Sequence, residues 1–117
     1  MEATTHDEAP IPDDWKRDVY AVLHRGTGII VRTSAQRRYC DSFANATKYD
    51  LFDAMAEALS CGTVMGRHVT DMQEPGETYT FKFFPEGRDF FGKICLCHDR
   101  KTIIIYSAHI SLKGDKL

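Results

Sequence analysis

Residues 77–110 read ETYTFKFFPEGRDFFGKICLCHDRKTIIIYSAHI, and this stretch decides the fold. Apolar and polar side chains alternate through its first two segments, 77–84 and 90–97, as they do in strands with one buried face. Two short turns, PEGR and HDRK, separate these segments from each other and from a third segment, 102–110. Its run Ile103-Ile104-Ile105 predicts a strand covered on both faces. The stretch therefore predicts three consecutive antiparallel strands.

The two loops also predict how these strands face each other. A four-residue loop in each hairpin places Lys82 opposite Phe91, and Lys93 opposite Tyr106. In that register one sheet face is polar and the other is apolar, whereas a slip of one residue would put a lysine among the phenylalanines. We expect the apolar face to lie under helices and the polar face to be open. The polar face is expected to carry Thr78, Thr80, Lys82, Lys93, Cys95 and Tyr106.

Upstream of the strands, two segments have the three- and four-residue spacing of amphipathic helices. One includes Trp15 and is predicted over residues 14–24, with Gly26 as its stop. The other opens at Thr47 and ends before Gly62. The first segment also alternates well enough for a hairpin, but Trp15 belongs to the helical stripe, and this favours the helix.

Shorter elements surround these two helices. Ile29-Ile30-Val31 is β-branched and predicts a strand or an extended link. Ser34 can cap a short helix that is broken at Asn45-Ala46, and residues 64–69 predict one more short strand. Together the elements predict an α+β fold, in which N-terminal helices pack on one face of a C-terminal antiparallel β-sheet of about four strands.

Length and charge indicate one domain with an acidic leader. The chain has 117 residues, of which 43% are hydrophobic, enough for a core that needs no disulfide or structural metal. The first fourteen residues hold five acids and no Lys or Arg. We expect residues 1–13 to form a flexible acidic leader and residues 14–117 a single, mildly basic α+β domain. Neither a signal peptide nor an apolar membrane-spanning run is visible, which predicts a cytoplasmic protein with no membrane partner.

The polar sheet face has the chemistry to act on a phosphodiester. Lys82 and Lys93 can bind phosphate oxygens, and Tyr106 or His109 can move a proton. In a strand that alternates strictly, the side chain of His109 would point to the apolar face. His109 lies near the end of its strand, however, where a side chain can reach around the edge of the sheet. Lysines are also ordinary on a solvated sheet face, so the pattern alone does not establish a site. Candidate phosphate contacts elsewhere are Arg37, Arg38, Arg67 and His68.

Several short motifs follow one another in an order that resembles a known family. They are Gly28, Val31-Arg32-Thr33, Ser34-Ala35, Gly92-Lys93-Ile94 and Ile103-Ile104-Ile105-Tyr106-Ser107. With the predicted order of helices and strands, they resemble the RelE-like ribonuclease toxins of bacterial toxin–antitoxin pairs, and in outline the motility quorum-sensing regulator branch. The resemblance implies a small endoribonuclease that needs no metal or cofactor, acts on messenger RNA, and is held off by an antitoxin. We expect an RNA partner, either messenger or transfer RNA. The resemblance also implies roles for Lys93 and Tyr106.

Two alternatives remain open beside this hypothesis. The chain could be a non-enzymatic binding protein, for example an inhibitor from a phage or mobile element that docks on a bacterial protein machine through its exposed sheet. The segment Cys95-Leu96-Cys97-His98, with Cys40 or Cys61, could hold zinc, but the usual two-residue spacer between zinc cysteines is missing. We therefore expect free thiols and no metal site. Motifs of serine hydrolases, phosphate-binding loops, dinucleotide-binding folds and zinc deaminases are absent from the sequence.

Overall fold

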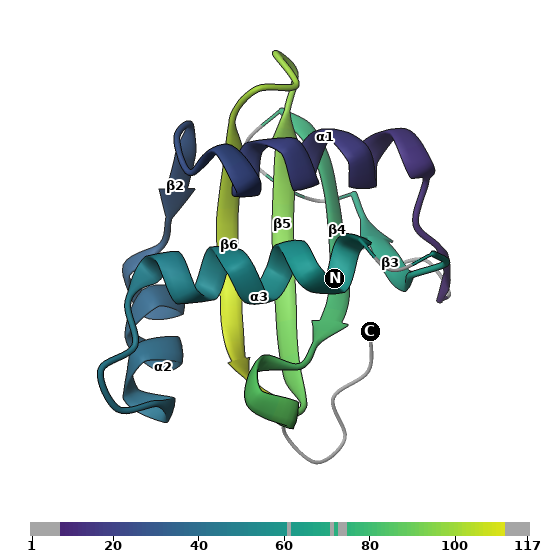
Figure 1. Cartoon of the computed structure of the whole chain (residues 1–117). Helices are drawn as coiled ribbons and strands as arrows, with labels where there is room; N and C mark the ends of the chain where they lie inside the picture. Colours follow the sequence, from purple (N-terminus) through teal and green to yellow (C-terminus); the bar gives the residue numbers. More distant parts are fainter. Residues whose placement is uncertain (1–7, 61, 71, 73–74, 112–117) are drawn as a thin grey trace.

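The computed structural model describes residues 8–60, 62–70, 72 and 75–111. At its centre lies a six-stranded sheet with the strand order β1-β3-β4-β5-β6-β2. Helices precede most of the strands, so the predicted α+β class is confirmed (Figure 1). The elements are β1 (Ala9–Pro10), α1 (Asp13–Arg25), β2 (Ile29–Val31), α2 (Thr33–Ser42), α3 (Lys48–Ser60), β3 (Met65–Val69), β4 (Gly76–Phe83), the 3-10 turn η1 (Pro85–Gly87), β5 (Phe90–Cys97) and β6 (Ile103–Ile110).

The sheet contains the four predicted strands and two short edge strands. Strands β3 to β6 form an antiparallel meander, and β1 adds to β3 in antiparallel orientation. At the other edge, β2 pairs with β6 in parallel. The segment Ile29–Val31, expected as a strand or an extended link, is thus a strand, and the sheet is wider than predicted because both of its edges are extended by short pieces of the N-terminal half.

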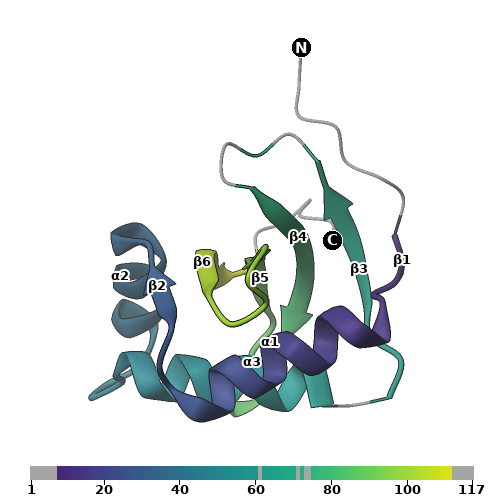
Figure 2. The same cartoon turned by 90° about the horizontal axis from the view of Figure 1, so that it is seen from above.

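Two of the three helices lie across one face of the sheet, and the third flanks it. Figures 1 and 2 show α1 and α3 side by side in front of the strands, whereas α2 stands at the end of the sheet beside β2 and β6. Among the described residues no helix covers the opposite face, which we call the open face. Within that same part of the chain, none of the helices has the length and apolarity needed to cross a bilayer.

Local signals account for where the helices begin and end. Gly26 follows α1 in the left-handed conformation, at φ 79°, and its N–H donates to the carbonyl of Val22. The carboxylate of Asp50 accepts a 2.8 Å hydrogen bond from the N–H of Thr47, which begins α3 as a capping box. Ser34 does not cap α2, because that helix already begins at Thr33. The alternative hairpin over the first helical segment is not formed.

The core forms between α1, α3 and the helix-covered face of the sheet. Trp15 is fully buried, stacks edge-on against Tyr79 at 5.0 Å and donates its indole N–H to the carbonyl of Glu77 at 2.9 Å. The three consecutive isoleucines of β6 are all buried, as predicted. The largest fully buried side chains of the sheet are Phe81, Phe83, Phe90, Ile94, Leu96, Ile103 and Ile105.

Part of the predicted leader belongs to the domain. Ala9–Pro10 pairs with β3, and the next residue, Ile11, is 2% exposed and packs in the core. Its apolar side chain provides the buried surface that the acidic residues around it lack. Residues 1–7 lie outside the described part of the chain, so the expectation of a flexible leader concerns those residues alone.

Candidate nucleic-acid interface

The first hairpin has the predicted register, and this register determines the open face. Lys82 pairs with Phe91, and Thr80 pairs with Lys93. Residues directly opposite each other project to the same side of a sheet, so both lysines lie on the open face. The centre of this face differs from the expectation of an exposed surface, because Thr78 and Thr80 are 1% and 5% exposed.

The second hairpin departs from the predicted register at a β-bulge. From Leu96 to Ile94, β5 pairs with β6 as predicted, but Lys93 then pairs with Ser107 instead of Tyr106. One extra residue of β6 is accommodated at this point. The prediction that Lys93 lies directly opposite Tyr106 was therefore wrong by one residue, because it assumed an uninterrupted ladder.

The bulge reverses which side chains of β6 face the helices. Ala108 lies opposite Gly92 and is fully buried, whereas His109 lies opposite Phe91. The rings of His109 and Phe91 stack with centroids 5.3 Å apart. Strict alternation would have turned the imidazole toward the core. Instead His109 shares the open face with Lys93, and bulges commonly re-aim side chains in this way next to active sites.

Two cations surround the ring of Tyr106. The Nζ of Lys93 lies 5.9 Å from the ring centroid, and the guanidinium carbon of Arg32 lies 5.1 Å from it. Arg32 reaches this position because β2 runs parallel to β6 and pairs Val31 with Ile105. The sequence interpretation gave Arg32 no role in the site, since the parallel pairing of a three-residue strand has no clear sequence signal. The register of β2 against β6, once known, places Arg32 beside Tyr106.

A groove follows the junction of α2 and β6 at the edge of the open face. Two adjoining hollows of about 290 and 230 Å³ share Arg38 from α2 and His109 from β6. The smaller hollow also reaches Tyr106 and the hydroxyl-bearing residues Ser34 and Ser107. A guanidinium, an imidazole, a phenol and three serines thus line one groove and can donate to phosphate oxygens, while Asp41 adds one carboxylate to the larger hollow.

Of the predicted catalytic residues, Lys82 is the least available to bind a phosphate, because it is paired with a carboxylate. Its Nζ lies 3.2 Å from a carboxylate oxygen of Asp89, across the turn that joins β4 to β5. Lys93, by contrast, has no carboxylate partner among the described residues. Both cations lie on the open face, but of the two only Lys82 has a carboxylate at ion-pair distance in the part of the chain that the structure describes.

The four residues predicted to contact phosphate lie in different parts of the structure. Arg38 lines the groove, and Arg67 lies on the open face because it pairs with Thr80. His68 lies on the other face, where its ring stacks on Tyr79 at 4.8 Å. Arg37 is exposed on α2 and does not line the groove. Helical spacing alone could not show which of the two neighbouring arginines turns toward β6.

The cysteines are not gathered into a metal site in the described part of the chain. Cys40, Cys95 and Cys97 are free thiols, and Cys95 is buried on the open face opposite Thr78. Cys61, one of the residues considered for zinc, lies outside the described residues. In the part of the chain that the structure covers, no three His, Cys, Asp or Glu side chains are close enough together to hold a metal ion.

The site is thus assembled from three segments that are separate in the sequence: residues 32–38, β5 and β6. Comparisons of the chain with models of protein families, with curated proteins and with solved structures found no match.

Proposed function

We propose that the protein is a small endoribonuclease that binds RNA on the open sheet face and cleaves it in the groove between α2 and β6. The observation that carries this proposal is the bulge in β6, which turns His109 out of the core and onto the face of Lys93. His109 lines the groove together with Arg38, and Lys93 lies on the adjoining open face beside Tyr106. This combination is what cleavage of a phosphodiester without a metal requires.

The reaction starts from the ribose 2′-hydroxyl, which attacks the neighbouring phosphorus atom. A base removes the hydroxyl proton as the new bond between phosphorus and the 2′-oxygen forms, and the bond to the 5′-oxygen breaks. An acid gives a proton to that departing oxygen. The products are a 2′,3′-cyclic phosphate and a 5′-hydroxyl, and no oxidant, reductant or further reactant is needed.

Five residues of the groove and of the adjoining open face have a role in this scheme. His109 is the candidate for proton transfer, because imidazole exchanges protons near neutral pH. Tyr106 is the second candidate and is held between two cations. Lys93 and Arg38 neutralise the negative charge that grows on the phosphate oxygens in the transition state. Phe91 offers a ring on which a base of single-stranded RNA can stack.

An RNA cleavage assay with the purified chain tests the proposal. A messenger transcript and a transfer RNA are incubated with the protein in the presence of EDTA, and the ends of the products are analysed for cyclic phosphate. His109→Ala is expected to lower the cleavage rate by about 100-fold or more, the usual effect of losing a proton-transfer group. Lys93→Ala is expected to act similarly through lost charge stabilisation.

The matched control is Lys101→Ala, since Lys101 is an exposed lysine in the turn between β5 and β6. It should leave the cleavage rate unchanged, and thermal unfolding of all three variants should match that of the wild type. If RNA stays intact at micromolar protein, or if His109→Ala and Lys93→Ala cleave as well as the control, the nuclease proposal is overturned. Intact RNA that is still bound on the open face would instead support a non-enzymatic binding protein.

A further inference from the structure

Four neighbouring strands contribute one row of paired residues to the open face. Arg67 of β3 pairs with Thr80 of β4, Thr80 pairs with Lys93 of β5, and Lys93 pairs with Ser107 of β6. Residues that lie directly opposite each other project to the same side of a sheet, so these four residues, which we call the transverse row, share the open face. Because neighbouring strands lie about 4.8 Å apart, the row extends roughly 14 Å from Ser107, which lines the groove, to Arg67.

Thr80, in the middle of the transverse row, has a buried hydroxyl without a partner. The residue is 5% exposed, and its Oγ1 makes no hydrogen bond within the part of the chain that the structure describes. Buried polar groups are nearly always hydrogen-bonded, because an unpaired hydroxyl loses its contact with water and gains nothing in return. An oxygen of a ligand that binds on the open face can satisfy this hydroxyl.

Both neighbours of Thr80 in the transverse row are cationic. Arg67 stands beside it on β3, and Lys93 stands beside it on β5. An anion with several oxygens fits this arrangement, because one oxygen can accept from the hydroxyl while others face the guanidinium and the ammonium group. A water molecule would also satisfy the hydroxyl, but it would bring no negative charge to the two cations. The chemistry of the row therefore favours a phosphate group.

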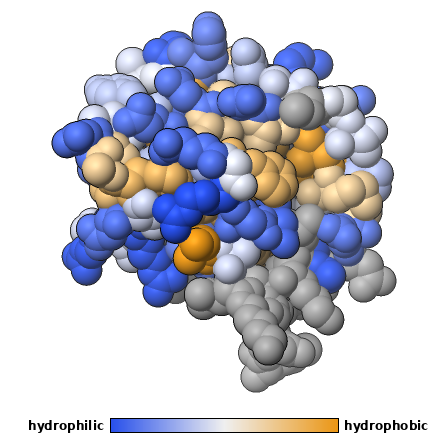
Figure 3. All heavy atoms as spheres, turned by 60° about the horizontal axis from the view of Figure 1, so that its bottom comes forward, coloured by the Kyte–Doolittle hydropathy of each residue, from blue (hydrophilic) through white to orange (hydrophobic). Residues whose placement is uncertain are grey.

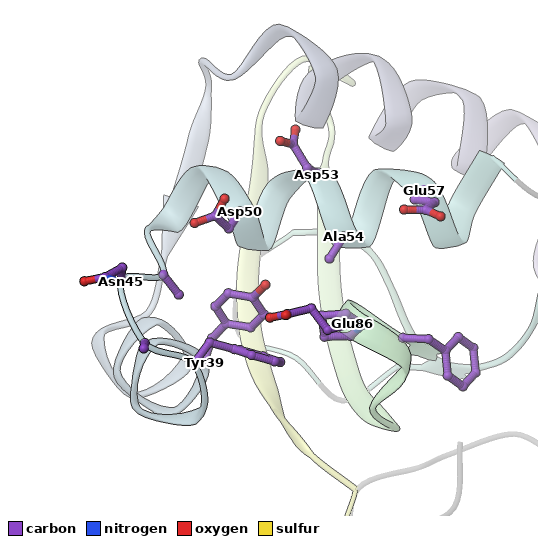
Figure 4. A pocket seen from close by; sticks show the side chains of 12 residues that line it. Tyr39, Asn45, Asp50, Asp53, Ala54, Glu57 and Glu86 are labelled. Carbon is purple, nitrogen blue, oxygen red and sulfur yellow. The ribbon is translucent and has the colours of Figure 1, made fainter.

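An RNA strand that leaves the groove meets different surfaces in different directions. The side of the molecule that includes η1 presents apolar patches set between strongly hydrophilic residues (Figure 3). A pocket of about 350 Å³ between α2, α3 and η1 is lined by four carboxylates, which repel phosphate groups (Figure 4). Toward β3, by contrast, the strand crosses β5 and β4 and meets the transverse row (Figure 2). The distribution of charge thus favours a path across the open face. The four carboxylates belong to Asp50, Asp53, Glu57 and Glu86.

We propose that the transverse row binds a second phosphate of the RNA, separate from the phosphate that is cleaved in the groove. This inference rests on the proposed function, since it takes RNA as the anion that reaches the open face. The hydroxyl of Thr80 donates to one oxygen of the second phosphate, Arg67 neutralises its charge, and Lys93 lies between the two phosphates. The substrate is therefore a single strand that continues past the cleaved bond, and a dinucleotide, which lacks the second phosphate, is cleaved poorly.

The test measures how short single strands bind when they cannot be cleaved. The probe is a fluorescent 2′-O-methyl hexanucleotide, and matched versions carry one uncharged methylphosphonate in place of a phosphate, at each position in turn. We expect one internal position, besides that of the scissile phosphate, at which the neutral group weakens binding to the wild type about tenfold. Thr80→Val should weaken binding of the fully charged strand by a similar factor. It should not weaken binding of the strand that is neutral at that position any further, because both changes remove the same contact.

Matched variants separate the contact of Thr80 from general effects on the sheet. Thr80→Ser keeps the hydroxyl and should bind as the wild type does. Thr78→Val makes the same change two residues away on β4, where the neighbours are Val69 and Cys95 instead of two cations, and should leave binding unchanged. Thr80→Val should unfold at the same temperature as the wild type or at a higher one, because it removes a buried hydroxyl that has no partner. Lower affinity without lower stability is not expected of a residue that only supports the fold.

The second phosphate site and the nuclease activity can fail separately. The site is overturned if Thr80→Val binds as well as the wild type, if Thr78→Val loses as much affinity, or if the effects of Thr80→Val and of the neutral group add at every position. Cleavage that depends on His109 but not on Thr80, with a dinucleotide cleaved as fast as a longer strand, would leave the nuclease standing without this site. If the binding results hold and RNA stays intact, the site is supported and the nuclease activity is not.

Discussion

At the scale of single residues, Arg100 connects the end of the sheet to the first helix. Its guanidinium lies 2.6 Å from Asp18, 3.2 Å from Glu77 and 3.6 Å from Asp14. The hydrogen bond from Arg100 is the largest cause that lowers the pKa of Asp18 below its ordinary value of 3.8. The side chain of Asp18 is 22% exposed, so this interaction is only partly screened by solvent.

This pairing predicts a specific dependence of stability on pH. Because the pKa of Asp18 is lower in the folded chain, its contribution to stability is present above the unfolded value of 3.8 and is lost as pH falls through the folded value. Asp18→Asn should therefore be less stable than the wild type by about 0.5–1 kcal/mol near neutral pH. The two proteins should converge as pH falls below the lowered pKa of Asp18 in the folded chain, where the carboxylate is protonated. Urea unfolding across that pH range measures the difference, and a gap that stays constant into acid would contradict the assignment.

At the scale of secondary-structure elements, the small residue Gly92 in β5 explains why β6 has a bulge at this point. Gly92 on β5 lies opposite Ala108, and both face the helices. A Cβ at position 92 would lie 3.2 Å from the end of the Met55 side chain and 3.3 Å from the rings of Phe81 and Phe83. Only small residues fit at this point of the core, so the bulge places Ala108 there and turns His109 away.

Gly92→Ala should therefore destabilise the fold. The added methyl group overpacks the junction of α3 with β4 and β5, and we expect a loss of about 1–2 kcal/mol in the free energy of unfolding. Gly62→Ala is the matched control, since no atom lies within 4 Å of the methyl group it would add. Its free energy of unfolding should change by no more than about 0.5 kcal/mol. If the Gly92→Ala protein is as stable as this control, the core around the bulge can rearrange to accept the methyl group, and the prediction is wrong.

These elements also show how far the sequence predicts the site. The alternation of β4 and β5 predicted the pairing of Lys82 with Phe91, because a slip would bury a charge. It did not predict the bulge, although polar Ser107 and His109 fall at the positions that strict alternation assigns to the core. That conflict is the local signal for a bulge. The approach of Arg38 to His109 depends on how α2 packs against β6, and a long-range contact of this kind leaves no periodic pattern in the sequence.

At the scale of the whole molecule, opposite charges lie on opposite sides of the sheet. The open face and its groove carry Arg32, Arg38 and Lys93 with the one carboxylate of Asp41, whereas a pocket between α2, α3 and η1 is lined by four carboxylates, Asp50, Asp53, Glu57 and Glu86. The net charge of −2 does not show this arrangement, because it sums 15 basic and 17 acidic residues over the whole chain. In the proposed function this distribution would attract RNA to the basic surface, repel it from the acidic one, and so orient the strand.

The salt dependence of binding tests this arrangement separately from cleavage. A fluorescent 2′-O-methyl oligonucleotide serves as the ligand, because it lacks the attacking hydroxyl and remains intact. Each phosphate contact on a single strand adds about 0.7 to the slope of log affinity against log salt concentration. Lys93→Ala should reduce the magnitude of the slope by about this amount, since it removes one contact from the open face. Glu86→Gln and Lys101→Ala should leave the slope unchanged, because both residues lie away from the groove. If Lys101→Ala reduced the slope as much as Lys93→Ala, and Glu86→Gln increased it, RNA would be held by the overall charge of the chain and not by the open face.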